Sequence, residues 1–149
     1  MTKLRLDQTC HPGAFAQLEA QAFERGWQES QFEERPDRIY TSLWQADHCL
    51  CYVYGRIITD EVELWRIAGH PERRRQGLGL RALNAFVAEC RRRGGRNLFL
   101  EVSHHNQVAV IFYRNAGFTE TGRRVGYYGP GDDALLMCLD LQTTPLTTL

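Results

Sequence analysis

A short glycine-containing segment, RRRQGLG at residues 73–79, constrains this sequence more than any other feature. Three arginines begin this segment, two glycines end it, and an amphipathic helical pattern follows. Positive charge and backbone N–H groups therefore converge where a helix begins. The first N–H groups of a helix have no partner within the helix, and an anion can accept hydrogen bonds from them. The segment therefore predicts a phosphate-binding loop.

The chain around this loop alternates between helical and strand patterns. Apolar spacings of three and four predict one helix from Pro12 to near Gly26, a second that follows the loop and stops at Gly94, and a third over residues 106–116. After an alternating start at Leu4 and Leu6, strands are expected at residues 39–44, 50–58, 62–68, 97–102, 118–124 and 134–141. Residues 127–133 are expected to form a turn-rich loop.

These elements predict an α/β fold in a single domain spanning residues 1–149, with a frayed tail at residues 143–149. Strands 39–44, 50–58 and 62–68 follow one another closely and should form an antiparallel meander. A helix separates strand 62–68 from strand 97–102. We therefore expect this last pair to be parallel, with a right-handed crossover.

Composition excludes several classes of partner. Eighteen Lys and Arg residues balance eighteen Asp and Glu residues, so no overall basic field favours direct nucleic-acid binding. No apolar run approaches the ~20 residues of a membrane span, and the first residues show no apolar signal core. The five cysteines lack metal-ligand spacing and are expected to be reduced. We expect a cytoplasmic protein that is a monomer or a weak dimer.

The glycines of the loop permit more than one ligand. Gly77, Gly79 and Ala82 match the dinucleotide-binding pattern G-x-G-x-x-[GA]. Glu101 follows near the sequence spacing at which that pattern has an acidic residue for the ribose. The charged residues before Gly77 argue against it, because a dinucleotide loop follows a buried strand directly. No Lys-Ser/Thr pair follows, which excludes a Walker A loop. A charged turn without a ligand remains an alternative.

Several segments together resemble the GNAT superfamily of N-acetyltransferases. The pattern Arg74-x-x-Gly77-x-Gly79 is similar to the acyl-CoA pyrophosphate loop of that family, and IAGHPERRRQGLG and NQVAVIFYRNAGF are similar to two of its longer motifs. The segments GWQESQF, LFLEV and GYYGPGDDALLM resemble RimI-type enzymes, which acetylate the N-terminal alanine of a small-subunit ribosomal protein. The likeness extends over most of the chain.

The resemblance implies a GNAT-like acyl-CoA N-acyltransferase fold, in which helices flank a central mixed, mostly antiparallel sheet. It also implies acetyl-CoA as the cofactor. The residues expected to bind coenzyme A are Ile67, Ala68, Gly69, Arg74, Arg75, Gln76, Gly77, Leu78, Gly79, Leu80, Asn106 and Tyr113. Relatives commonly have valine where Gly69 stands, and Asn106 could instead serve only as a helix N-cap.

Two residues are expected to be catalytic. The resemblance implies Glu101 as the general base for the acceptor amine and Tyr113 as the general acid for the departing thiolate. The alternatives are a solvated glutamate at a strand end and a core tyrosine. No cysteine lies in a recognisable base-paired motif, which favours direct transfer over an acyl-enzyme.

The acceptor side of the site is less defined. Trp27, Phe32, Tyr127 and Tyr128 are candidates for walls of a peptide groove, although isolated aromatic residues more often only pack. The adjacent His104 and His105 are expected to point in different directions on a solvated loop, and no metal site is expected.

The predicted function is transfer of an acetyl group to a protein or peptide N-terminus, and the resemblance implies that of a small-subunit ribosomal protein. One alternative is acetylation of a small amine or a lysine side chain. Another is a non-catalytic acyl-CoA sensor.

Overall fold

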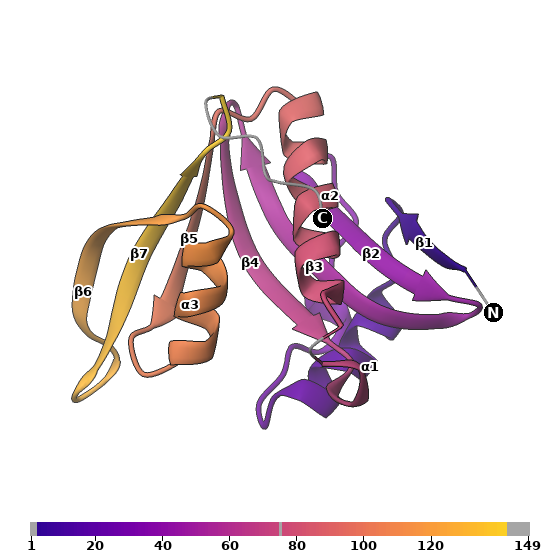
Figure 1. The fold of residues 1–149 in the computed structure, drawn as a ribbon, viewed down its shortest axis with the longest axis horizontal. Helices are drawn as coiled ribbons and strands as arrows, with labels where there is room; N and C mark the ends of the chain where they lie inside the picture. Colours follow the sequence, from indigo (N-terminus) through magenta and orange to yellow (C-terminus); the bar gives the residue numbers. More distant parts are fainter. Residues whose placement is uncertain (1–2, 75, 143–149) are drawn as a thin grey trace.

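A seven-stranded sheet organises the chain in the computed structural model, which describes residues 3–74 and 76–142 (Figure 1). The strands lie in the order β1-β2-β3-β4-β5-β7-β6. Their bounds are β1 Leu4–Asp7, β2 Arg38–Gln45, β3 His48–Ile58, β4 Glu61–Gly69, β5 Asn97–Ser103, β6 Thr119–Gly129 and β7 Asp132–Asp140. Neighbouring strands are antiparallel except β4 and β5, which are parallel. The predicted mixed, mostly antiparallel sheet is confirmed.

Helices cover both faces of this sheet (Figure 1). Helix α2 (Leu78–Arg92) and helix α3 (Gln107–Asn115) pack on one face, and helix α1 (Pro12–Ala22) packs on the other. Two short 3-10 helices, η1 (Glu29–Gln31) and η2 (Pro71–Arg73), lie in the connections. Among the described residues, no helix is both long enough and apolar enough to cross a membrane.

The two faces bury two separate apolar clusters. Cys51 and Val53 of β3 belong to the cluster under α2 and α3, whereas Tyr52 and Tyr54 belong to the cluster under α1. This division follows from the period of two along a strand, which sends successive side chains to opposite faces. The α1 cluster is rich in aromatic rings, such as Phe15 stacked on Tyr52 at 4.7 Å between centroids.

A β-bulge interrupts the pairing of β3 with β4. Tyr54 pairs with Arg66 but the next residue, Gly55, pairs with Leu64, so Trp65 is an extra residue on β4. A bulge reverses which side chains face which side of the sheet. Leu64 therefore lies in the cluster under α2, whereas Arg66 points toward α1.

Two of the predicted boundaries were wrong. The predicted loop at residues 127–133 is mostly strand, because β6 continues to Gly129 and only a tight turn separates it from β7. Gly126, Gly129 and Gly131 have positive φ, which lets the chain bulge and reverse within a few residues. Helix α1 ends at Ala22, before Gly26. The predicted tail at residues 143–149 lies outside the described residues.

Replacing Gly55 should destabilise the fold. A Cβ atom at this position would lie 2.0 Å from the backbone oxygen of Glu63, so Gly55→Ala forces the bulge to shift. We expect a loss of about 1–3 kcal/mol in the free energy of unfolding, measured by urea denaturation. Gly69→Ala is the matched control, because its Cβ would meet atoms no closer than 3.8 Å. Equal stability of the two variants would contradict the steric role of Gly55.

Candidate active site

The sheet opens between β4 and β5. These strands pair only at Glu61–Asn97, Val62–Leu98 and Glu63–Phe99, after which they diverge (Figure 1). Strand β4 stays paired with β3 as far as Gly69, and β5 stays paired with β7 as far as Ser103. The facing edges therefore offer backbone N–H and C=O groups to a ligand. The predicted contact residues Ile67, Ala68 and Gly69 lie on this open part of β4.

The predicted phosphate loop leads into the N-terminus of α2. Gly77 is the N-cap and has a left-handed conformation, with φ of 73° and ψ of 11°. No heavy atom lies within 4 Å of the position that its Cβ would occupy. The first hydrogen bond of the helix runs from Arg81 N–H to the Gly77 carbonyl at 3.1 Å. The N–H groups of Leu78, Gly79 and Leu80 precede it and can bind an anion.

One arginine fixes this loop and another lies on its surface. Arg73 donates from Nε to Gln76 Oε1 at 2.9 Å and from Nη1 to Gln45 Oε1 at 2.8 Å, which ties the loop to β2. Arg74 is exposed beside it. The prediction for Arg75 lies outside the described residues. An exposed cation, a left-handed glycine and a helix N-terminus together fit a pyrophosphate.

Tyr113 projects from α3 into the cluster on the α2 side of the sheet. Its side chain is buried, with rings of Phe112 and Phe118 at 5.4 and 5.5 Å between centroids. Burial raises the pKa of Tyr113 above its ordinary value, and the charge of Arg66 offsets part of that effect. The phenol therefore keeps its proton at neutral pH, which is the state that a general acid requires.

Asn106 has a structural task. Its Oδ1 accepts a hydrogen bond from Ala109 N–H at 3.2 Å and caps the N-terminus of α3. The side-chain oxygen of Asn106 therefore serves as the helix N-cap, which was the alternative role considered for this residue. The amide nitrogen is the group of Asn106 that could serve coenzyme A.

Glu101 lines a groove of about 780 Å³ on the other side of the sheet. The groove runs between β4, β5 and the β6–β7 hairpin, and Trp27, Tyr127 and Tyr128 contribute to its walls. Arg124 Nη2 lies 3.6 Å from Glu101 Oε1, and the carboxylate remains one third exposed at 33%. Burial and the nearby charge of Glu101 raise the pKa of Tyr128. A carboxylate in an aromatic-walled groove can accept a proton from a bound amine.

Phe32 does not join the other three aromatic candidates. It is only 1% exposed and packs against Phe15, Tyr52 and Tyr54 in the cluster under α1. The interpretation of Phe32 as a groove wall is corrected, because its ring lies behind Trp27 at 5.2 Å between centroids. Phe32 can support the wall but does not line the groove.

Arg66 is a groove residue that the sequence interpretation missed. Its guanidinium donates to Glu19 from Nε at 2.6 Å and from Nη2 at 3.1 Å, and it lies over the ring of Trp27 at 5.5 Å. Glu19 is fully buried. The available signal was a charged residue within the apolar strand segment LWRIA, since a charge is rarely buried without a partner.

The cysteines offer little nucleophilic thiolate. All five are free, and burial raises the pKa of both Cys51 and Cys90 to about 12 and that of Cys10 to about 11. A thiol attacks as its thiolate, which is scarce at neutral pH when the pKa is this high. The site therefore suits direct transfer to an acceptor.

Comparison with known proteins gives a consistent result. Residues 4–118 match the model of the acetyltransferase (GNAT) family. The ribosomal protein bS18-alanine N-acetyltransferases of Escherichia coli K12 and Salmonella typhimurium are 32% and 31% identical over 141 residues, covering 91% of this chain and 95% of each relative. The crystal structure of the Escherichia coli ribosomal-protein-S18-alanine N-acetyltransferase matches with a TM-score of 0.86 and 27% identity, covering 95% of this chain and 96% of that one.

Removing the buried carboxylate should weaken the fold around the groove. Glu19→Gln leaves Arg66 without its charged partner, and we expect the free energy of unfolding to fall by about 2–4 kcal/mol in a urea titration. The matched control is Glu89→Gln, which removes the partner of the exposed Arg92. That change should leave the urea midpoint almost unaltered. Similar losses in both variants would contradict a special role for the buried pair.

Proposed function

The chain belongs to the GNAT family of acetyltransferases, and we propose that its acceptor is the α-amino group at the N-terminus of a protein, specifically that of a small-subunit ribosomal protein. It is an acetyl-CoA-dependent N-acetyltransferase. The acceptor proposal is supported by relatives named for acetylating the alanine of ribosomal protein bS18. A cytoplasmic location follows from the proposal, because ribosomal proteins are made there.

The observation that carries the proposal is the opening between β4 and β5, which has different chemistry on its two sides. The N-terminus of α2 and the buried Tyr113 lie on the α2 side, whereas Glu101 faces the groove with Trp27. A donor held on one side and an amine held on the other can meet in the gap. This arrangement supports transfer without a covalent intermediate on the protein.

Acetyl-CoA supplies the acetyl group as a reactive thioester. The residues proposed to hold it are the N–H groups at the start of α2, Arg74, and the open backbone edge of β4 from Ile67 to Gly69. A backbone N–H on that edge can donate to the thioester carbonyl oxygen and stabilise its developing charge. The glycine at position 69 retains this N–H group.

Glu101 and Tyr113 divide the proton transfers in this proposal. An α-ammonium group has a pKa of about 7.7–8.0, so a carboxylate acting directly or through water can remove its proton near neutral pH. Tyr113 holds a proton on its buried hydroxyl and can donate it to the departing sulfur. Burial raises the pKa of Tyr113, so the phenol is protonated when the thiolate departs.

The acceptor can be tested with a peptide panel. Incubation with acetyl-CoA and a peptide that begins with a free alanine should release coenzyme A and add one acetyl group to the N-terminus, detected by mass spectrometry. The same peptide with a blocked N-terminus and one internal lysine should not react. Acetylation of that lysine would contradict the α-amine proposal. Turnover of small amines without peptide turnover would contradict it as well.

The acid role of Tyr113 predicts a separation of kinetic effects. Tyr113→Phe should lower kcat about 100-fold or more, because the phenol hydroxyl is lost. The dissociation constant of acetyl-CoA, measured by calorimetry, should change little. Tyr40→Phe is the control, since Tyr40 packs beside Tyr54 away from the groove lining. An unaltered kcat in Tyr113→Phe would remove Tyr113 from the acid role.

A further inference from the structure

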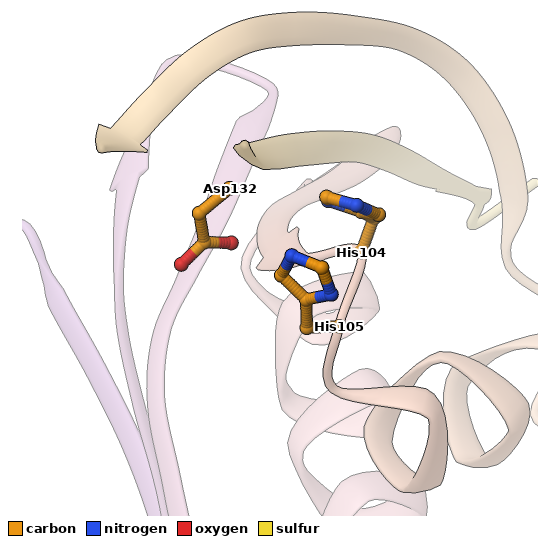
Figure 2. Close-up of side chains that lie close together, drawn as sticks. All are labelled: His104, His105 and Asp132. Carbon is orange, nitrogen blue, oxygen red and sulfur yellow. The ribbon is translucent and has the colours of Figure 1, made fainter. Parts of the chain in front are cut away.

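Two neighbouring turns bring three potential metal ligands together outside the proposed proton-transfer pair. His104 and His105 lie between β5 and α3, and Asp132 begins β7. Because β5 and β7 pair antiparallel as far as Ser103 and Ala134, the end of one strand meets the start of the other. Figure 2 shows the two imidazole rings and the carboxylate around a common space. One ligand atom from each residue lies within 4.8 Å of those of the other two.

The expectation that the two histidines point in different directions was wrong. Their ring centroids are 3.9 Å apart, with an angle of 38° between the ring planes. The turn that follows β5 bends the chain here, so the alternation of an extended strand does not apply. Both rings therefore face the β6–β7 turn.

Backbone and hydroxyl groups orient each of the three side chains from behind. His104 Nδ1 accepts a hydrogen bond from the backbone N–H of Asp133 at 3.0 Å and lies 3.3 Å from the carbonyl oxygen of the same residue. Zinc binding through Nε2 would place the ring proton on Nδ1, which would then donate to that carbonyl in place of accepting from the N–H group. Ser103 donates its hydroxyl hydrogen to Asp132 Oδ1 and accepts from the His105 backbone N–H at 3.2 Å. Such outer contacts are typical of protein metal sites.

We propose that His104, His105 and Asp132 bind one zinc ion. Two imidazole nitrogens and one carboxylate oxygen are ligands that Zn²⁺ prefers, and three protein ligands leave a fourth position for water. Ligand atoms on a tetrahedral zinc ion lie roughly 3.3 Å apart, given bonds of about 2.0 Å. The three groups must therefore approach one another, and His105 Nε2 must exchange its contact with the Gly131 carbonyl, now 2.7 Å away, if it is the ligand.

The ion would join the turn before α3 to the turn between β6 and β7. The second turn follows Tyr127 and Tyr128, which line the groove beside Glu101. Zinc would thereby fix the rim of the groove without taking part in acetyl transfer. The proposal departs from the sequence-based expectation that the chain has no metal site.

Zinc binding can be measured on the untagged full chain after treatment with a chelator. Titration calorimetry with Zn²⁺ should show one ion per chain, and Co²⁺ should give the visible absorption of a tetrahedral site. His105→Ala and Asp132→Asn should each weaken Zn²⁺ binding at least about 10-fold. Zn²⁺ should also raise the melting temperature of the unsubstituted chain but not that of His105→Ala.

His48→Ala is the matched control, because His48 is an exposed histidine beside Asp47, with Nε2 and Oδ1 3.6 Å apart. It should bind Zn²⁺ as well as the unsubstituted chain. Ser103→Ala, which keeps all three ligands, should weaken binding by a smaller factor than His105→Ala. Absence of one-to-one binding, or an equal effect of His48→Ala and His105→Ala, would overturn the proposal. These outcomes do not depend on which amine is acetylated.

Discussion

The short ladder between β4 and β5 is the constraint on which the rest of the site depends. The strands share three residue pairs, and their facing edges then carry polar backbone groups that no neighbouring strand satisfies. An unpaired backbone edge inside a sheet is unfavourable unless a ligand or water bonds to it. The helix that starts at Leu78 and the carboxylate of Glu101 lie on the two sides of this opening.

Arginine side chains hold the elements around the opening in place. Arg66 reaches α1 because the bulge at Trp65 turns it to that face, and Arg73 ties the phosphate loop to β2. At the far end of α2, Arg93 donates to the Arg38 carbonyl at 2.7 Å, and Arg91 donates to the Leu141 carbonyl at 2.7 Å. These four arginines thus connect segments that are distant in the sequence, as the planar, multi-donor guanidinium can.

Local patterns predicted the elements well but not the contacts between distant ones. Helix α2 and the meander of β2, β3 and β4 follow from apolar periodicity and from glycine and polar turns, which act over a few residues. The bulge at Trp65 could not be predicted in this way, because it depends on which residue of β3 faces it. The approach of Asp132 to His104 likewise arises from strand pairing across about thirty residues. Glu101 and Tyr113 were proposed from a family resemblance, since neither periodicity nor composition distinguishes them from surface and core residues.

The short ladder also divides the sheet mechanically. Strands β1 to β4 form one part of the sheet, and β5, β7 and β6 form the other. The strand pairing that joins the two parts lies at one end only. At the open end, the two parts of the sheet are held together by helix packing and by any ligand that hydrogen-bonds to both strand edges. A ligand seated there acts as a missing strand. Its binding free energy then adds to the stability of the whole sheet, so occupancy and folding are thermodynamically linked.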